Sequence, residues 1–83
     1  MILNSIKDIK KLSELTSGQS GIIDELSMHI FTTRMLAMGI IPGKRITLIR
    51  KQPWNGSYYV EVDGHYIGLR IQEAELIQIK GEF

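Results

Sequence analysis

The 83-residue sequence contains no cysteine, only two prolines and a small share of aromatic residues. The lack of cysteine excludes disulfide bonds and thiolate metal sites. No stretch approaches the roughly 20 apolar residues of a membrane-spanning helix. The N-terminal segment MILNSIKDIKK (1–11) has neither the basic leader nor the long apolar stretch of a signal peptide. We therefore expect one cytoplasmic domain, spanning 1–83, without membrane insertion.

Neither sign of charge dominates the chain. Ten basic and nine acidic residues are interspersed and give a formal net charge of +1. The aromatic residues Trp54, Tyr59 and Tyr66 are of the type that stacks on unpaired bases, but this mode also requires a cationic groove. The supply of Lys and Arg near them is ordinary for a protein surface, so we expect no nucleic-acid binding.

Sequence motifs of enzymes are missing as well. The chain has no G-x-S-x-G nucleophile elbow, no phosphate-binding G-x-x-x-x-G-K-[ST] loop and no H-E-x-x-H zinc helix. Hydrolases and transferases need a nucleophile or paired acid and base groups in one pocket. We expect a protein that is not an enzyme.

The apolar periodicity predicts a mostly β domain. Apolar side chains recur at every second position in the segments that follow residue 45, which is typical of half-buried strands. We expect about five short strands that curl into a small closed barrel, with one or two short helices. The predicted elements are a helix over 5–12, a strand over 19–26, a helix over 27–38, strands over 45–51, 58–62 and 66–70, a helical turn over 72–75 and a strand over 76–80.

Three glycine-containing sites predict how the chain turns. Gly39 directly follows the second predicted helix, where glycine can take the left-handed conformation that caps a helix. Pro42 and Gly43 suit the two central positions of a type II turn. Asp63 and Gly64 are a strong signal for a type I′ β-hairpin.

A stripe of methionines is the unusual feature of the second predicted helix. Met28, Phe31, Met35 and Met38 recur at helical spacing and would lie on one face. Methionine fills irregular gaps in small cores, so we expect most of the stripe to be buried. The alternative is that part of it stays exposed as an adaptable surface for another protein.

One cluster has the composition of a weak metal site. Asp24, Glu25 and His29 lie within six positions, and oxygen and imidazole ligands suit divalent iron or zinc. The same composition is common at a capped, solvated corner between two elements. We expect no cofactor to be required, and keep weak divalent-metal binding at these residues as the alternative.

Four segments in order resemble the FeoA-like domain family. They are LSELTSGQSGII (12–23), RMLAMGIIPGKRITLI (34–49), KQPWNG (51–56) and GLRIQEAELIQI (68–79). The match runs over about 12–80 and leaves 1–11 as an extension. Two departures are Trp54 in a loop that commonly reads Pro-x-Gly-x-Pro, and Met35 and Met38 at positions that usually hold leucine.

The resemblance implies a small SH3-like β-barrel and a role in bacterial ferrous-iron uptake. Such a protein acts beside the membrane transporter FeoB and its cytosolic GTP-binding domain. The same domain occurs at the C-terminus of DtxR-type metal-responsive repressors. We therefore expect a non-catalytic accessory protein that docks on the cytosolic portion of FeoB, at the inner face of the membrane. A free-standing metal-sensing domain is the alternative.

The residue types favour one docking surface around the second helix and a smaller patch on the sheet. Aromatic, Met and Arg side chains are enriched in the cores of protein interfaces. Apolar contact is the predicted role of the Met and Ile side chains, and pairing with an acidic group of the partner that of Arg34. Exposed strand edges or the methionines could also mediate self-association. The predicted contact residues are Arg34, Met35, Met38, Ile40, Ile41, Trp54 and Tyr59.

Overall fold

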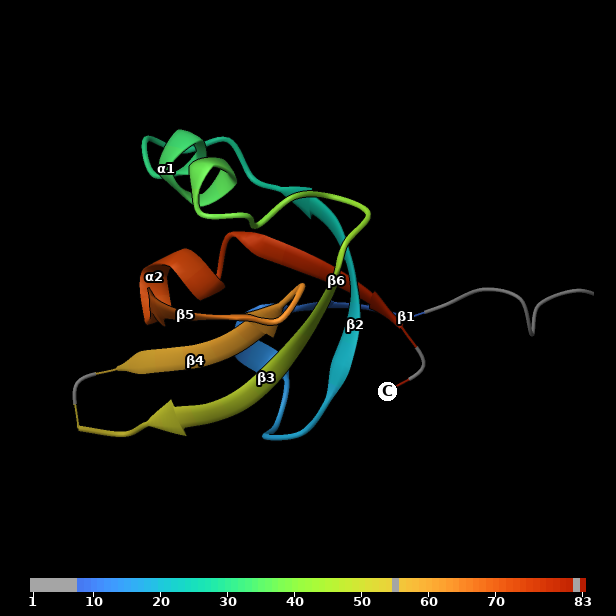
Figure 1. Cartoon of the computed structure of the whole chain (residues 1–83), viewed down its shortest axis with the longest axis vertical. Helices are drawn as coiled ribbons and strands as arrows, with labels where there is room; N and C mark the ends of the chain where they lie inside the picture. The colour runs from blue at the N-terminus through green and yellow to red at the C-terminus, as the bar shows by residue number, and fades with distance from the viewer. Residues whose placement is uncertain (1–7, 55, 82) are drawn as a thin grey trace, which may run out of the picture.

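The computed structural model describes residues 8–54, 56–81 and 83 (Figure 1). Within these residues the chain forms a single antiparallel sheet of six strands with two short α-helices and one 3₁₀ turn. The elements are β1 (Asp8–Lys11), η2 (Leu12–Glu14), β2 (Ser20–Leu26), α1 (Thr32–Ala37), β3 (Arg45–Gln52), β4 (Ser57–Val62), β5 (His65–Arg70), α2 (Ile71–Ala74) and β6 (Ile77–Gly81).

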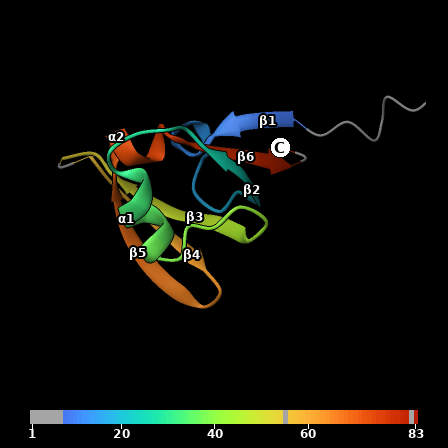
Figure 2. The same ribbon diagram turned by 90° about the horizontal axis from the view of Figure 1, so that it is seen from above.

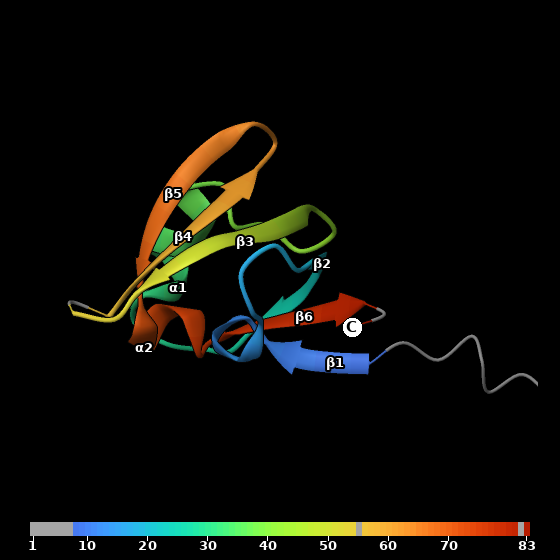
Figure 3. The ribbon, with the colours of Figure 1, turned by 90° about the horizontal axis from the view of Figure 1, so that it is seen from below.

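The six strands follow the order β1-β6-β2-β3-β4-β5. Figure 3 shows them as a curved sheet with β5 at one edge and β1 at the other. In Figure 2 both helices lie on the left of the molecule, whereas the C-terminal end of the chain lies on the right. The prediction of a mostly β fold with short helices is confirmed. The sheet is not closed by pairing of β1 with β5, so the predicted closed barrel is an open one.

The core forms on the concave face because the strands alternate in burial. In β4, Tyr58, Val60 and Val62 are buried while the residues between them are partly exposed. In β6, Ile77 and Ile79 alternate with more exposed residues in the same way. The predicted strands of this half of the chain are confirmed, within one or two residues at their ends. The buried apolar set is Leu12, Leu15, Ile23, Met35, Ile40, Ile46, Leu48, Tyr58, Val60, Val62, Leu69, Ala74, Ile77 and Ile79.

The predicted first helix is wrong where the structure describes it. Residues 8–11 form β1, which pairs antiparallel with β6 and places Lys10 opposite Ile79. Ile9, counted toward an apolar helix face, is 49% exposed, and Leu12 enters the core from η2. The edge of β6 needs a pairing partner, and this tertiary demand overrides the local helical spacing. The predicted cap at Ser5 lies outside the described residues.

The predicted second helix is shorter than expected. It spans only Thr32–Ala37, so Met28 lies outside it and is 93% exposed. The Thr32 hydroxyl accepts a 3.0 Å hydrogen bond from the His29 backbone N–H and donates one of 2.8 Å to the Ser27 carbonyl. A threonine bonded in this way favours a capped turn over continued helix.

The glycine predictions are confirmed. Gly39 has a φ of 101°, and its N–H donates to the Leu36 carbonyl at 3.0 Å. The Ile40 N–H donates to the Met35 carbonyl at 3.0 Å, which completes a Schellman motif at the end of α1. Met35 and Ile40 are both fully buried and provide the apolar contact that accompanies this motif.

The two predicted turns are also confirmed. The Lys44 N–H donates to the Ile41 carbonyl at 3.1 Å, and Gly43 between them has a φ of 96°, as position i+2 of a type II turn requires. Asp63 and Gly64 have φ angles of 53° and 80°, and two successive positive values define the type I′ hairpin.

Candidate functional site

One face of α1 is fixed firmly to the rest of the domain. Met35 points into the core and has no exposed surface. The Arg34 guanidinium donates a 2.8 Å hydrogen bond to a carboxylate oxygen of Glu73, and that side chain is 1% exposed. The other Glu73 oxygen accepts a 2.9 Å hydrogen bond from the Arg70 backbone N–H. The buried charge therefore has a partner at each oxygen, as a buried carboxylate requires.

Exposed apolar side chains lie on α1 and on the loops that flank it. Leu36 on α1 and Ile41 after it are 42% and 40% exposed. Met28 and Ile30, in the loop before α1, are 93% and 82% exposed. We call these four side chains the helix surface. Single exposed apolar residues are ordinary, but four on one short segment mark a candidate contact site.

The predicted contact residues of this region differ in their exposure to solvent. Met35 and Ile40 have no exposed surface and are out of reach of a partner, because both belong to the core. Arg34 is paired with Glu73 of its own chain, and its side chain is 51% exposed. Met38 is partly buried against the core, and Ile41 remains exposed. We therefore correct the predicted contact set by removing Met35 and Ile40.

The residues of the methionine stripe also differ in burial. Met35 is fully buried and Phe31 and Met38 are only partly buried against the core, so the expectation that most of the stripe is buried holds in full for Met35 alone. Met28 is the exception, since it lies in the loop and not on the helix.

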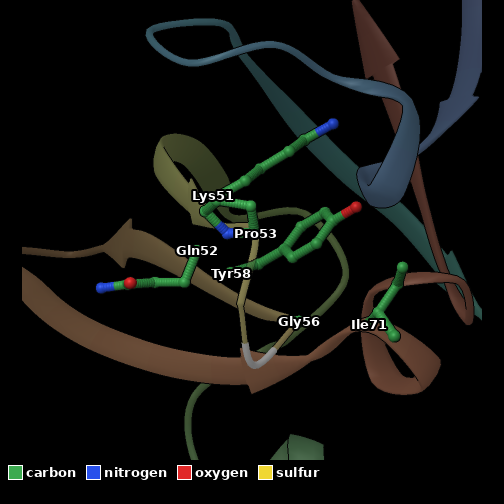
Figure 4. Close-up of a pocket in the computed structure, with 6 residues that line it drawn as sticks. All are labelled: Lys51, Gln52, Pro53, Gly56, Tyr58 and Ile71. Atoms are coloured by element: carbon green, nitrogen blue, oxygen red, sulfur yellow. The ribbon is translucent and has the colours of Figure 1, made fainter.

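A second candidate site lies between the β3–β4 hairpin and α2. It is a pocket of about 340 Å³. In Figure 4 the Tyr58 ring lies between Pro53 and Ile71, while the amide of Gln52 points away. Lys51 places its ammonium 5.1 Å from the Tyr58 ring centroid and donates a 3.1 Å hydrogen bond to the Ser13 carbonyl. We call this the hairpin pocket; its lining residues are Lys51, Gln52, Pro53, Gly56, Tyr58 and Ile71.

The predicted second patch is spread over different parts of the hairpin. Trp54 lies at the tip and is 95% exposed. Tyr59 lies within β4, where the Arg50 guanidinium carbon is 5.1 Å from its ring centroid. Gly68 on β5 lies beside the same ring, and a Cβ built on it would be 3.5 Å from the nearest Tyr59 atom. Tyr59 is thus held between two neighbours, whereas Trp54 is open to solvent.

The three residues predicted as weak metal ligands are engaged elsewhere or exposed. The Asp24 carboxylate lies 3.3 Å from the Lys80 ammonium. His29 accepts a 3.3 Å hydrogen bond at Nδ1 from the Phe31 backbone N–H, and their rings are 4.8 Å apart. Over the part of the chain that the structure describes, no three His, Asp or Glu side chains are grouped to hold a metal ion. Weak metal binding stays a prediction.

Sequence reasoning missed two features of these sites. Glu73 was not identified, although it lies three residues after Arg70, the spacing at which a Glu side chain binds the backbone N–H before a helix. Ile71 was not identified as a pocket residue because its contacts with the hairpin depend on the fold.

Among the residues described, no helix is long and apolar enough to span a membrane.

Comparison with known proteins identifies a family. The model of the FeoA domain matches residues 10–81. The chain is 35% identical over 69 residues to a candidate Fe(2+) transport protein A of Campylobacter jejuni, a match that covers 82% of this chain and 93% of that protein. It is 30% identical over 71 residues, 84% of its length, to a fusion of Fe(2+) transport protein A with Fe(2+) transporter FeoB of Porphyromonas gingivalis, of which it covers only 8%.

Solved structures share the fold. A crystal structure of an iron uptake regulatory protein, FeoA, superposes with a TM-score of 0.78 at 20% identity and covers 88% of this chain and 96% of that one. A manganese-dependent transcriptional repressor superposes with a TM-score of 0.83 at 17% identity, covering 90% of this chain and 42% of the repressor. The first confirms the predicted SH3-like architecture, and the second shows that part of a repressor has the same fold.

Proposed function

Because the chain belongs to the FeoA domain family, we propose that it is a non-catalytic protein of ferrous-iron transport that docks on the cytosolic portion of an FeoB-type transporter. The observation that supports this most directly is the relative in which an FeoA segment and FeoB form one polypeptide. A covalent link keeps two domains at a high effective concentration, which favours even a weak contact between them. Separate chains with the same task need a surface that recognises the transporter.

The helix surface is the best candidate for that contact. Its side chains are apolar and exposed, and Met35 and the Arg34–Glu73 pair anchor α1 to the rest of the domain. A rigidly anchored apolar surface loses little conformational entropy on binding. Interface cores are also typically apolar and depleted of charge. We propose that Leu36 and Ile41 contact the transporter, with Met28 and Ile30 beside them.

Two substitutions of equal exposure test this surface. Ile41 and Ile49 are each 40% exposed, but Ile49 lies on β3 within the bulge between Leu48 and Arg50. We expect Ile41→Glu to weaken binding to the soluble cytosolic portion of the transporter by about tenfold or more, measured by calorimetry. Ile49→Glu is the matched control and should bind as wild type. Equal binding by both variants would contradict the placement.

The same experiment separates the proposed roles. Binding is measured with and without guanine nucleotide, and GTP hydrolysis by the transporter is followed with and without the protein. A change in hydrolysis that Ile41→Glu abolishes would indicate regulation of the GTPase. Binding without such a change would indicate that the protein holds the transporter assembly together. Failure of the wild-type protein to bind in any nucleotide state would overturn the proposed function.

A further inference from the structure

One edge of the sheet is unpaired and accessible. β5 pairs only with β4 among the described residues, and it is the last strand in the sheet order. Gly68 and Tyr66 are exposed, Tyr66 to 75%. Glycine has no side chain, so the exposure of Gly68 is exposure of the backbone itself. An edge of this kind is a template for another strand.

The hairpin geometry fixes which backbone groups of β5 face outward. A two-residue type I′ turn is closed by a hydrogen-bonded pair, here Val62 and His65. In antiparallel pairing, hydrogen-bonded and non-hydrogen-bonded pairs alternate along the strands. Tyr66 and Gly68 therefore direct their N–H and C=O groups away from β4. Arg70 also faces outward, but its N–H is bound to the Glu73 carboxylate at 2.9 Å, so the free edge ends there.

We propose that β5 pairs antiparallel with β5 of a second copy of this chain, around a two-fold axis at Ile67. In this register Tyr66 of each copy forms a hydrogen-bonded pair with Gly68 of the other. Both outward N–H groups and both outward C=O groups of each copy then find a partner. Two six-stranded sheets become one continuous sheet across the axis.

The side chains of β5 fit their own copies in this register. Ile67 is half-buried on the core side, and the two Ile67 residues would meet as a non-hydrogen-bonded pair, the closer type of cross-strand pair. On the other face, the exposed Tyr66 ring would cover Gly68 of the second copy, where no side chain opposes it. The Tyr59 ring already lies against Gly68 on that face. The two glycines would thus each be enclosed by two tyrosine rings.

Charge favours a second copy over an unrelated strand. The acidic residue Asp63 precedes β5, and the exposed Arg70 ends it. Antiparallel pairing brings Arg70 of one copy beside the turn that carries Asp63 of the other, twice per dimer. The Asp63 carboxylate is already paired with Lys44 of its own chain, so Arg70 would be a second cation beside it. The opposite edge is less suited to pairing, because β1 has only four residues and two of them are lysines, which protect an edge from pairing.

The inference does not depend on the proposed function, and proline at Gly68 tests it. Gly68→Pro removes the outward N–H without removing a hydrogen bond to β4, and proline is tolerated on edge strands. Gly68→Ala adds a Cβ at an ordinary contact distance and keeps the N–H, so it is the matched control. We expect sedimentation equilibrium to show a wild-type dimer, and association in Gly68→Pro that is weaker by about tenfold or more than in Gly68→Ala, which carries an added side chain but keeps the N–H.

A second measurement needs no variant. Amide hydrogen exchange at Tyr66 and Gly68 should slow as the wild-type concentration rises through the dimer range, because these two N–H groups become bonded. The proposal is overturned if the wild-type protein is monomeric over the whole accessible concentration range. It is equally overturned if dimerisation leaves exchange at Tyr66 and Gly68 unchanged, since the second copy would then occupy another surface.

Discussion

Arg34 on α1 and Glu73 on α2 form an ion pair of 2.8 Å that ties the two helices together. Glu73 is 1% exposed while the Arg34 side chain is 51% exposed, so the pair lies at the boundary of the core. A buried carboxylate that loses its cation keeps the full cost of leaving water. The pair therefore contributes, with the buried Met35, to the attachment of α1 to the rest of the domain.

Removing the cation should destabilise the domain. We expect Arg34→Ala to lower the free energy of unfolding by about 1–3 kcal/mol, because a charged hydrogen bond to a buried group is lost. Urea unfolding followed by circular dichroism measures the effect. Arg45→Ala is the control: Arg45 is exposed and makes a single 3.3 Å hydrogen bond to Ser20, so we expect a change below about 0.5 kcal/mol. Equal effects would show that the Arg34–Glu73 pair has no special role.

Met35 and Met28, two methionines of the same sequence stripe, should differ sharply in their contribution to the free energy of unfolding. Met35 is fully buried, and Met35→Ala should cost about 2–5 kcal/mol by leaving a cavity. Met28 is 93% exposed, and Met28→Ala should change stability by less than about 0.5 kcal/mol. Thermal or urea unfolding of the two variants measures both values. Similar costs for the two would mean that Met28 also packs in the core in solution.

The strands and turns of this fold were readable from sequence because local and tertiary demands agree there. The alternation of Tyr58, Val60 and Val62 matches the side of β4 that faces the core. The Asp63–Gly64 pair supplies the two positive φ angles that a short hairpin requires. Where these signals coincide, a period of two is enough to fix both the element and its buried face.

The first strand and the candidate sites were not readable, because both depend on distant residues. Local spacing favoured a helix around Ile9, but β6 needed a partner along Lys80 and Ile79. Arginine is a residue type that is common in interfaces, but Arg34 pairs within its own chain with Glu73. That partner lies 39 positions away and could not be identified from local sequence. Composition indicates which residue types are suited to an interface and does not reveal which of them the fold has already used.

Gly39 should tolerate substitution according to how well the new residue adopts a positive φ. Its φ is 101° and a Cβ would meet nothing within 4 Å, so backbone strain alone determines the cost. We expect Gly39→Ala to cost about 1–2 kcal/mol, and Gly39→Asn to cost less, because asparagine enters the left-handed region more readily. Thermal unfolding of both variants measures the difference. A larger cost for asparagine would show that space and not conformation limits this position.

Metal binding at Asp24 should be weak. A divalent ion would have to displace the Lys80 ammonium that lies 3.3 Å from the Asp24 carboxylate. We expect no saturable heat when ferrous or zinc ion is titrated into micromolar protein under anaerobic conditions. Lys80→Gln removes the competing cation and should increase any affinity at this position, which Asp24→Asn should abolish. Tight binding by the wild-type protein that persists in Asp24→Asn would place a metal site elsewhere.

Trp54 offers a direct test of which end of the molecule meets the transporter. It is the only tryptophan in the chain, and it is 95% exposed. Figure 1 shows α1 at the top left of the molecule and the β3–β4 hairpin extending to the lower left, away from α1. Docking through the helix surface should therefore leave Trp54 emission unchanged when a tryptophan-free form of the transporter's cytosolic portion is added. A blue shift on binding would show that the hairpin takes part in the contact.

Trp54→Ala should bind as wild type and change stability by less than about 0.5 kcal/mol, because the ring packs against so little of the domain.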